Sequence, residues 1–477
     1  MAGEPRLDLV WFRNDLRVRD NPALWHGAQH GPVAAVFVLC PDQWRTHPMA
    51  PCRADFLLRS LRALEGELAR LNIPLWVIGG DTFAAVPDAL ASLCRRLGAR
   101  AIHWNDEYPL DEARRDGAVA ARLGASGIAC HRYHDRALAP PGTVVKADGG
   151  GYQVFTPFKR AWLNLLDQGA PDLLPAPRRQ SPGCMAWTGR GDIPGALPGF
   201  ASALPATLWP AGEREARRRL DQFCRDGLAH YQRQRDLPAL EGTSALSPYL
   251  AVGAISPQEC LRAALQVKAG DGAAADGADT WISELVWRDF YQHIVAAHPR
   301  VCMGKPFLPG TDRVPWRDDP VQFEAWCQGR TGVPLVDAGM RQLRETGWMH
   351  NRVRMVTAMF LAKNLLIDWR LGERFFMEHL VDGDFPANNG GWQWSASTGT
   401  DAAPYFRIFN SFSQAERFDP EGAYIQRFVP ELRGLPARVL HKPALLARHR
   451  PATYPAPVVD VSLSRQLAID AFRAASA

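Results

Sequence analysis

The sequence predicts a two-part fold, an N-terminal α/β domain joined by a connector to a C-terminal all-helical domain. Short apolar runs alternate with amphipathic stretches over residues 1–137, which is typical of a sheet covered by helices. Proline-rich pieces follow over residues 138–212, and in the last part, residues 213–477, strand patterns are absent from about 213 to 446. A chain of 477 residues also exceeds what one hydrophobic core usually serves, so more than one domain is expected.

Five apolar runs predict the strands of the first domain. They cover residues 7–13, 33–39, 74–78, 100–104 and 128–133. Helical spacing of apolar residues marks the stretches between them, at residues 53–71, 83–97 and 111–123. Strands and helices in alternation predict a doubly wound parallel sheet. No GxGxxG motif follows the first run, so the common dinucleotide fingerprint is absent.

The connector and the second domain have different patterns. The connector is rich in proline and glycine around one helix-like stretch, residues 156–166. In the second domain, amphipathic spacing predicts helices at residues 213–227, 256–268, 281–298, 334–346, 351–366 and 371–381. The low-complexity piece at residues 269–279 is expected to be a surface loop.

Composition excludes several classes of protein. A hydrophobic content of 47% with 22% charged residues is ordinary for a globular protein, and no apolar run approaches the ~20 residues of a membrane span. The N-terminus lacks a secretory pattern, so we expect a cytoplasmic protein without a membrane partner. The nine cysteines stand far apart without a CxxC pair, which predicts reduced thiols and no zinc site. The net charge is only +5. A basic surface for an anionic polymer would therefore have to be formed by arginines and lysines that folding brings together.

The most unusual segment is DGDFPANNGGWQWSAST, residues 382–398. It combines two acids, adjacent asparagines, a glycine pair and two tryptophans, which a hydrophobic core does not need. Trp392 and Trp394 point in different directions whether the segment is a strand or a helix. The residues alone leave two interpretations open, a functional site and a loop that ends a helix.

Three further segments mix aromatic and polar residues. On a helix over residues 281–294, a single face would carry Trp281, Glu284, Trp287, Arg288 and Tyr291. Such a face is either a cleft wall or an ion-paired surface. Residues 347–355 combine amide, guanidinium and thioether groups in either a site or a helix N-terminus. The Gly-Thr-Ser turn within residues 231–256 suits either a phosphate or a helix cap.

Together these segments resemble the photolyase/cryptochrome family of flavoproteins, and they are most similar to the class I cyclobutane pyrimidine dimer photolyases of bacteria. The resemblance covers nearly the whole chain. It begins at VWFRNDLRVRDNPAL (10–24), continues through residues 154–162 and 233–253, and is densest over residues 281–432. It implies an α/β domain joined by a long connector to a helical FAD domain, which agrees with the architecture inferred above.

The resemblance implies a light-driven DNA repair enzyme, a carbon–carbon lyase. In this reaction reduced FAD, excited by blue or near-ultraviolet light, donates an electron to a cyclobutane pyrimidine dimer, the ring splits, and the electron returns. The dimer is flipped out of the duplex, and photolyases are themselves counted among base-flipping enzymes. The implied cofactor is FAD, the implied partner is dimer-containing DNA, no metal is required, and we expect a monomer.

The resemblance also assigns roles to individual residues. The expected FAD contacts are Tyr231, Thr243, Ser244, Ala245, Leu246, Ser247, Trp281, Arg354, Asp382, Gly383, Asp384 and Asn388. Arg354 and Asp384 are expected to pair beside the flavin ring. Asn388 corresponds to the position that faces flavin N5, where a neutral amide favours the reduced flavin and plant cryptochromes carry Asp.

Further residues correspond to the substrate pocket and to an electron relay. The expected dimer contacts are Glu284, Trp287, Asn351, Met355 and Trp394. Arg288 and Arg352 are expected to engage the DNA backbone or the pocket rim. The expected relay from the surface to the flavin consists of Trp316, Trp369 and Trp392, which with Glu284 and Asn388 make up the catalytic set.

A light-harvesting antenna is also implied. His47 and Glu112 correspond to positions that contact 5,10-methenyltetrahydrofolate, although Asp111 replaces an Asn and Met303 replaces a Lys of the folate-binding members. Folate is therefore the expected antenna, and a deazaflavin or no antenna are the alternatives.

The alternative function is a cryptochrome-type photoreceptor that signals through a partner. Asn388 and the dimer-pocket residues favour the enzyme, and only about 45 residues follow the last strong match at 432, where signalling cryptochromes typically add a long extension. Asn351 and Met355 stand where six-four photolyases usually carry a His pair, so that reaction is not expected. A flavin-binding module without light chemistry would leave the three relay tryptophans unexplained.

Overall fold

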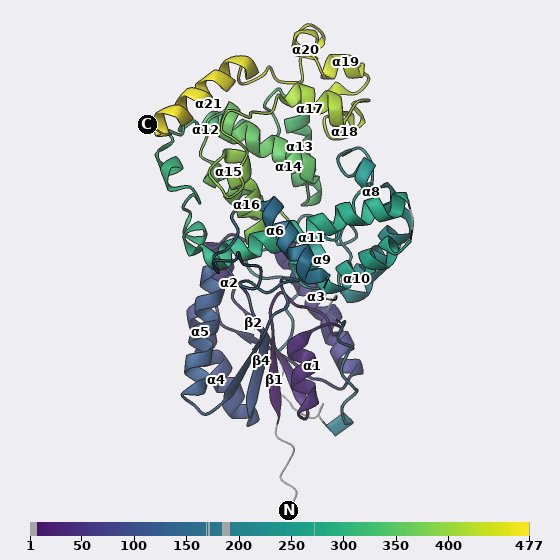
Figure 1. Ribbon diagram of the computed structural model, residues 1–477, viewed down its shortest axis with the longest axis vertical. Coiled ribbons are helices and arrows are strands. Elements are labelled where there is room, and N and C mark those ends of the chain that lie inside the picture. Colours follow the sequence, from purple (N-terminus) through teal and green to yellow (C-terminus); the bar gives the residue numbers. More distant parts are fainter. Residues whose placement is uncertain (1–6, 168, 170–171, 184–190, 271, 477) are drawn as a thin grey trace, which may run out of the picture. The chain divides into compact units, whose positions relative to one another are not determined.

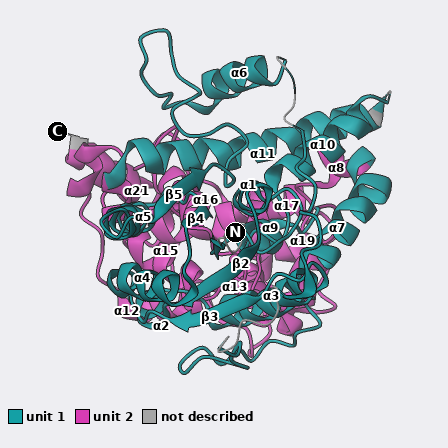
Figure 2. Cartoon of the chain, turned by 90° about the horizontal axis from the view of Figure 1, so that it is seen from below, with its two compact units in different colours: residues 1–229, 244–299 teal, residues 230–243, 300–477 magenta. Residues whose placement is uncertain are grey.

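The computed structural model of the protein describes residues 7–167, 169, 172–183, 191–270 and 272–476. The chain forms two compact units (Figure 2). Unit 1 contains residues 1–229 and 244–299, and unit 2 contains residues 230–243 and 300–477. Among the described residues, no helix is long and apolar enough to cross a membrane. The described cysteines are free thiols, whereas Cys184 lies outside the described residues.

Unit 1 contains a five-stranded parallel sheet in the order β3-β2-β1-β4-β5. The strands are β1 (Asp8–Phe12), β2 (Val33–Leu39), β3 (Leu75–Gly79), β4 (Ala101–Asn105) and β5 (Ala129–Tyr133). Every residue of β1 and β4 is buried, because helices cover both faces at the centre of a doubly wound sheet. The five predicted strands and the parallel sheet are confirmed.

The crossover helices follow the predicted pattern. They are α1 (Pro22–Gln29), α2 (Pro41–Thr46), α3 (Pro51–Arg70), α4 (Val86–Leu97) and α5 (Leu110–Gly124), with a short 3₁₀ turn at Phe83–Ala85. Figure 1 shows α4 and α5 together on one side of the strands and α1 on the other. This arrangement follows from right-handed crossovers that run first toward β3 and then back toward β5.

The connector packs firmly against unit 1. Its helix α6 (Phe155–Leu166) contacts α11 (Ala273–Ala297). The buried carboxylate of Asp289 on α11 accepts hydrogen bonds from the backbone amides of Leu138 and Ala139, at 3.0 and 2.9 Å, and from Trp162 Nε1 at 3.0 Å. The helix predicted at 156–166 is confirmed. These bonds attach the connector to α11, which belongs to the same compact unit as the sheet.

The helices that follow the connector also begin in unit 1, so the two units divide the chain differently from the predicted boundary at residue 213. They are α7 (Glu213–Gln222), a π-helical turn (Phe223–Gly227), α8 (Leu228–Gln234), α9 (Ser247–Ala251), α10 (Pro257–Lys268) and α11. The unit boundary falls within α8.

The loop predicted at residues 269–279 is wrong from Ala273 onward, where α11 begins. Gly277 lies in the first turns of this helix, and a Cβ atom there would stand 1.8 Å from the carbonyl oxygen of Leu228. Glycine and alanine have no helical periodicity to read in a sequence, and here they serve close packing between two backbones.

The described part of unit 2 is helical apart from turns and one isolated bridge, Arg317–Ile367. Its longer helices are α12 (Pro320–Cys327), α13 (Pro334–Thr346), α14 (Asn351–Met359) with a π-helical end (Phe360–Asn364), α15 (Trp369–Met377) and α16 (Phe385–Ala396). Beyond them lie α17 (Ser411–Phe418), α18 (Ala423–Phe428), α19 (Ala437–Leu440), α20 (Pro443–His449) and α21 (Val461–Ser476). Short 3₁₀ turns occur at Pro299–Met303, Pro309–Arg313 and Pro430–Leu432.

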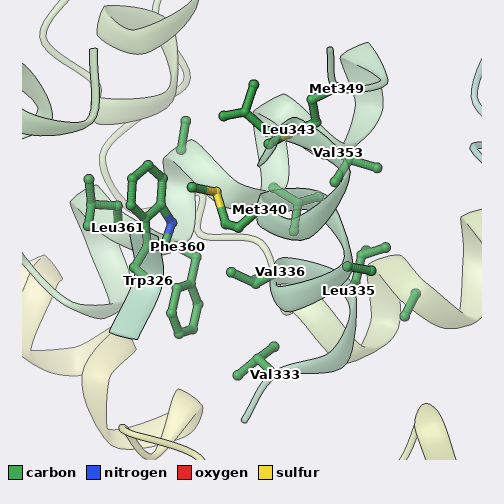
Figure 3. Packing of buried hydrophobic residues seen from close by; sticks show 14 of the residues in the cluster. Trp326, Val333, Leu335, Val336, Met340, Leu343, Met349, Val353, Phe360 and Leu361 are labelled. Carbon is green, nitrogen blue, oxygen red and sulfur yellow. The ribbon is translucent and has the colours of Figure 1, made fainter. Parts of the chain in front are cut away.

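The core of unit 2 is centred on α13 and α14. Figure 3 shows Met340 of α13 between Trp326 on one side and Val353 of α14 on the other. Each of these side chains is fully buried in one large hydrophobic cluster. This packing holds the polar face of α14 and the helix α16 in fixed positions, and both carry predicted site residues.

Candidate active site

In unit 1, the predicted polar and aromatic face of α11 is present. Trp281 is buried and packs edge-on against Phe223, with ring centroids 5.1 Å apart. Glu284 and Trp287 are partly exposed on the same face. The interpretation as a cleft wall is therefore consistent with burial at one end of the face and access at the other.

Two further contacts involve this face. The Trp287 indole lies face to face with the ring of Phe155, with centroids 3.6 Å apart and planes 7° apart. Arg288 is half-buried, and its guanidinium donates to the backbone carbonyl of Arg136. The predicted role of Arg288 at DNA would have to compete with this bond.

In unit 2, the first turns of α14 present the predicted polar residues. Asn351 is exposed and Met355 is half-buried, four residues later on the same side of the helix, whereas Val353 and Val356 face the core. Arg352 pairs with Asp236 at 2.9 Å and lies 4.5 Å from the ring centroid of Phe418.

The carboxylate found beside Arg354 is that of Asp382, whereas the resemblance predicts a pair with Asp384. Its Nη2 atom lies 3.0 and 2.8 Å from the two carboxylate oxygens of Asp382, and its Nε atom donates to the carbonyl of Met349 at 2.7 Å. The amide of Val381 donates to the carbonyl of Gly347 at 2.7 Å, which places Asp382 beside the start of α14. Asp384 instead stands directly before α16 as its N-cap residue.

The segment 382–398 contains a helix, α16, and its asparagines are fixed by hydrogen bonds. Asn388 Nδ2 donates to the backbone carbonyl of Glu373 at 3.0 Å, and Asn389 Nδ2 donates to the Glu373 carboxylate at 2.8 Å. Gln393 Nε2 donates to Asn389 Oδ1 at 2.9 Å. Burial raises the pKa of the Glu373 carboxyl to about 7, against the opposing effect of the Asn389 bond.

The three tryptophans that the resemblance assigns to an electron relay lie in or against the core of unit 2. Trp392 and Trp369 are buried in the same cluster, and Trp316 is partly exposed and packs against that cluster. The amide of Arg317, next to Trp316, donates to the carbonyl of Leu366 at 2.7 Å, which joins this segment to the turn that precedes α15. The order of burial, two interior indoles and one at the surface, suits a path between solvent and interior.

The other predicted flavin contacts lie around residues 231–247. Tyr231 is buried on α8, and the Arg235 guanidinium lies 5.5 Å from its ring centroid. Ala245 has a left-handed backbone with φ of 49°, which costs about 1 kcal/mol or more for a residue with a side chain. Leu246 is the N-cap residue of α9, so neither Thr243 nor Ser244 caps that helix. A strained turn with polar side chains fits ligand binding better than capping.

Both predicted antenna residues, His47 and Glu112, lie in unit 1. His47 Nε2 lies 3.1 Å from the carboxylate of Asp111, and both groups are solvent-accessible. Glu112 follows in the first turn of α5, and burial, with the nearby Glu107 charge, raises its pKa to about 7. A protonated carboxyl at this place can donate a hydrogen bond.

Comparison with known proteins decides the family. The family described as "DNA photolyase" matches residues 8–178, and the family described as "FAD binding domain of DNA photolyase" matches residues 281–474. The chain belongs to the DNA photolyase family. The expected resemblance and fold class are thereby confirmed, and the described residues contain no cluster of three or more His, Cys, Asp or Glu residues that would hold a metal.

Individual DNA photolyases match along almost the whole chain. The deoxyribodipyrimidine photo-lyases of Escherichia coli and Vibrio cholerae are each 44% identical, over 98% of this chain and 98% and 99% of theirs. The crystal structure of a class III photolyase from Agrobacterium tumefaciens has a TM-score of 0.89 and 35% identity, covering 100% of this chain and 98% of that one. The cryptochrome of Synechocystis sp. PCC6803 has a TM-score of 0.87 and 28% identity, covering 98% and 100%.

The residues of this photolyase-family chain fit an FAD on structural grounds. The left-handed Ala245 is a strained turn, and Arg354, which is partly exposed, forms a charge-assisted pair with the buried carboxylate of Asp382. Gly391 on α16 is exposed with open space around its Cα, so a flat ring can approach the backbone near Asn388. Ala245 in unit 1, and Arg354, Asp382 and Gly391 in unit 2, belong to segments in which the resemblance predicts flavin contacts.

The sequence assigned no role to Phe155, Asp236, Glu373 or Asn389, although Asn389 lies in the segment 382–398 singled out above. Phe155 stacks on Trp287, and Asp236 pairs with Arg352. Glu373 accepts hydrogen bonds from Asn388 and Asn389 of α16. Phe155 lay within the quoted segment 154–162, so the family pattern marked its position without its role. Nothing in the sequence marks Glu373, because a glutamate on an amphipathic helix is ordinarily solvated.

Proposed function

We propose that this chain is a light-driven DNA repair enzyme, a deoxyribodipyrimidine photo-lyase that splits cyclobutane pyrimidine dimers. The relatives at 44% identity over nearly the full length carry that name. The observation that carries the proposal within the site is the fixed amide of Asn388. Because its nitrogen is bound to Glu373 O, its oxygen is the atom left to accept a hydrogen bond from a protonated flavin N5.

We propose that the residues around Arg354, Asp382 and Tyr231 hold the cofactor. FAD in its reduced form supplies, when bound, the electron that light excitation makes available. Asn388 orients an acceptor toward the flavin, and the Arg354–Asp382 pair fixes the wall beside it. The backbone and side chains of residues 243–247, together with Trp281, Gly383 and Asp384, are proposed to complete the binding of its phosphates, ribityl chain and ring.

The dimer is proposed to bind through stacking and hydrogen bonding. Trp287 and Trp394 offer aromatic faces, and each base stacked on such a face contributes about 1–3 kcal/mol. Glu284 and Asn351 supply polar groups for the pyrimidine edges, and Met355 supplies a polarisable apolar contact. Arg288 and Arg352 are proposed to approach the phosphates, so binding will weaken as salt is raised.

Trp316, Trp369 and Trp392 are proposed to carry electrons inward from solvent. The partly exposed Trp316 is the entry point, and the buried Trp369 and Trp392 are the interior steps. This path would convert oxidised FAD into its active reduced form under light, and it is separate from repair itself.

We propose 5,10-methenyltetrahydrofolate as the antenna. The raised pKa of Glu112 and the His47–Asp111 pair support a polar ligand at this place. Met303 speaks against folate, because it is exposed and lacks the charge of the lysine that it replaces. The test is the absorption spectrum of purified protein before and after incubation with each candidate. A folate band that appears in the wild type and is lost in Glu112→Ala supports folate, whereas a deazaflavin band or none refutes it. A cytoplasmic location and a monomeric state stay predictions.

The function is tested by repair in the light. Reduced protein is mixed with an oligonucleotide that carries one cyclobutane thymine dimer, under blue light or in darkness, and the product is separated by chromatography. Light-dependent return of intact thymines establishes the enzyme. Absence of repair by protein that contains fully reduced FAD refutes it and favours the photoreceptor. The similarity to a cryptochrome structure is compatible with that alternative.

A further inference from the structure

The stack between Phe155 and Trp287 is unusual in geometry. Two aromatic rings prefer an offset or edge-to-face arrangement, with centroids about 4.5–7 Å apart. Here the centroids are 3.6 Å apart and the planes differ by 7°, so one ring lies directly over the other. Because two isolated rings do not favour full overlap, we infer that the packing around this stack maintains it.

Those surroundings are rigid. Phe155 is the first residue of α6 and is 9% exposed, and its ring also meets Phe290 edge-on at 5.9 Å. One turn further along α6, Phe158 packs on Phe290 at 5.1 Å and on His293 at 5.0 Å.

Hydrogen bonds fix the same two segments. Asp289 accepts from Trp162 Nε1 at 3.0 Å, and His293 Nε2 lies 2.9 Å from the carbonyl oxygen of Ala139. The chain before Phe155, at Ala139, and the chain after it, at Trp162, are therefore both attached to α11, the helix that carries Trp287.

An indole ring has two faces, and the stack leaves one of them. Phe155 covers the first face, while Phe290 meets the edge of the indole at 5.7 Å and 79°. The Tyr291 ring centroid lies 5.6 Å from that of the indole, with its plane tilted by 31°. Trp287 is nevertheless partly exposed. Because Phe155 covers one face, we infer that a flat ligand reaches the indole from the other.

We propose that Phe155 is a positioning residue for the lesion. It fixes the plane of the Trp287 indole and occupies one of its faces, so that a flipped pyrimidine can stack only on the other. This proposal rests on the proposed function, because it concerns how Trp287 receives the dimer. Fixing the indole before binding removes the entropic cost of ordering it afterwards.

A different role for the same ring would be that of a placeholder that the base displaces. The burial of Phe155, its second contact with Phe290 and the attachment of α6 to α11 oppose displacement. The two roles predict opposite changes in affinity. Removal of a support weakens binding of the dimer, whereas removal of a placeholder strengthens it.

The test compares Phe155→Leu and Phe155→Ala with the matched control Phe158→Leu, which removes a neighbouring ring of α6. Dark binding is measured by fluorescence anisotropy with a dimer-containing oligonucleotide and with its undamaged counterpart, and FAD content and melting temperature verify folding. We expect both Phe155 variants to raise Kd for the dimer by about tenfold. Binding of undamaged DNA and the repair yield per photon at saturation should change little, and Phe155→Tyr should restore tight binding.

A double-mutant cycle with Trp287→Ala identifies the path of the effect. If Phe155 acts through the indole, Phe155→Leu has no further effect once Trp287 is alanine. An equal loss in both backgrounds, an unchanged Kd in folded Phe155 variants, or tighter binding overturns the proposal while leaving repair by the wild type intact. A wild type that neither prefers damaged DNA nor repairs it overturns the proposed function, and the role of Phe155 with it.

Discussion

The side-chain nitrogen of Asn388 lies 3.0 Å from the backbone carbonyl oxygen of Glu373, to which it donates a hydrogen bond. This bond joins α16 to α15 and fixes which atom of the amide is free. An aspartate has no proton to donate at neutral pH, and its negative charge would face the Glu373 carbonyl.

We therefore expect Asn388→Asp to retain FAD but to lose most light-driven repair, because a carboxylate disfavours the electron-rich reduced flavin. The reduced state is followed by absorbance during illumination and during reoxidation in air. The exposed neighbour Ala387 provides the control, since Ala387→Ser alters α16 without altering this bond. A variant that reduces and repairs like the wild type would remove Asn388 from the mechanism.

Glu373 predicts a pH dependence of stability. Burial raises the pKa of its carboxyl to about 7, above the value of about 4.3 in an unfolded chain. The folded state then binds more protons than the unfolded state between these two values, so the contribution of Glu373 to the free energy of unfolding falls as pH rises from about 4.3 to 7.

Glu373→Gln should remove that dependence, so its stability relative to the wild type should increase by about 1–3 kcal/mol between pH 4.5 and pH 8. Urea unfolding at the two pH values measures the difference. A difference that does not vary with pH would show that this carboxyl is ionised at neutral pH in the folded protein.

Arg354→Met should release FAD and destabilise unit 2. It leaves the carboxylate of Asp382, which is 2% exposed, buried without its partner, a loss of about 3–5 kcal/mol. Arg374→Met, at an exposed position on α15, is the control. FAD content after gel filtration and the melting temperature give the result, and full retention of both would contradict the importance of the pair.

Trp316→Phe should separate photoreduction from repair. The variant should reduce oxidised FAD slowly under light, because the relay loses its surface end, yet it should repair normally once reduced chemically. Trp25→Phe, at a half-buried position on α1, should leave both rates unchanged. Equal photoreduction in wild type and Trp316→Phe would show that electrons enter elsewhere.

The fold was predictable where local pattern and tertiary packing agree. The five strands are short apolar runs buried at the centre of a sheet, and sequence periodicity reports that burial directly. The start of α11 was not predictable, because Gly277 is selected by contact with Leu228, which is distant in sequence.

The site was predictable by residue type and family pattern, but not by pairing. Asp382 and Asp384 are equivalent in sequence as partners for Arg354, and only the structure shows the carboxylate of Asp382 beside it, next to the bond from Val381 to Gly347. The stack of Phe155 on Trp287 joins two helices that are far apart in the chain, so no local sequence pattern predicts it.

The absence of a side chain at Gly372 has a consequence for the timing of electron flow. A Cβ atom there would stand 2.1 Å from the Trp392 ring, so the indole on α16 packs directly against the backbone of α15. Close-packed contacts of this kind yield little to thermal motion. Since α15 also begins with Trp369, the spacing of the two inner indoles should fluctuate little, and electron hopping, which is steeply sensitive to distance, should proceed at a nearly uniform rate from molecule to molecule.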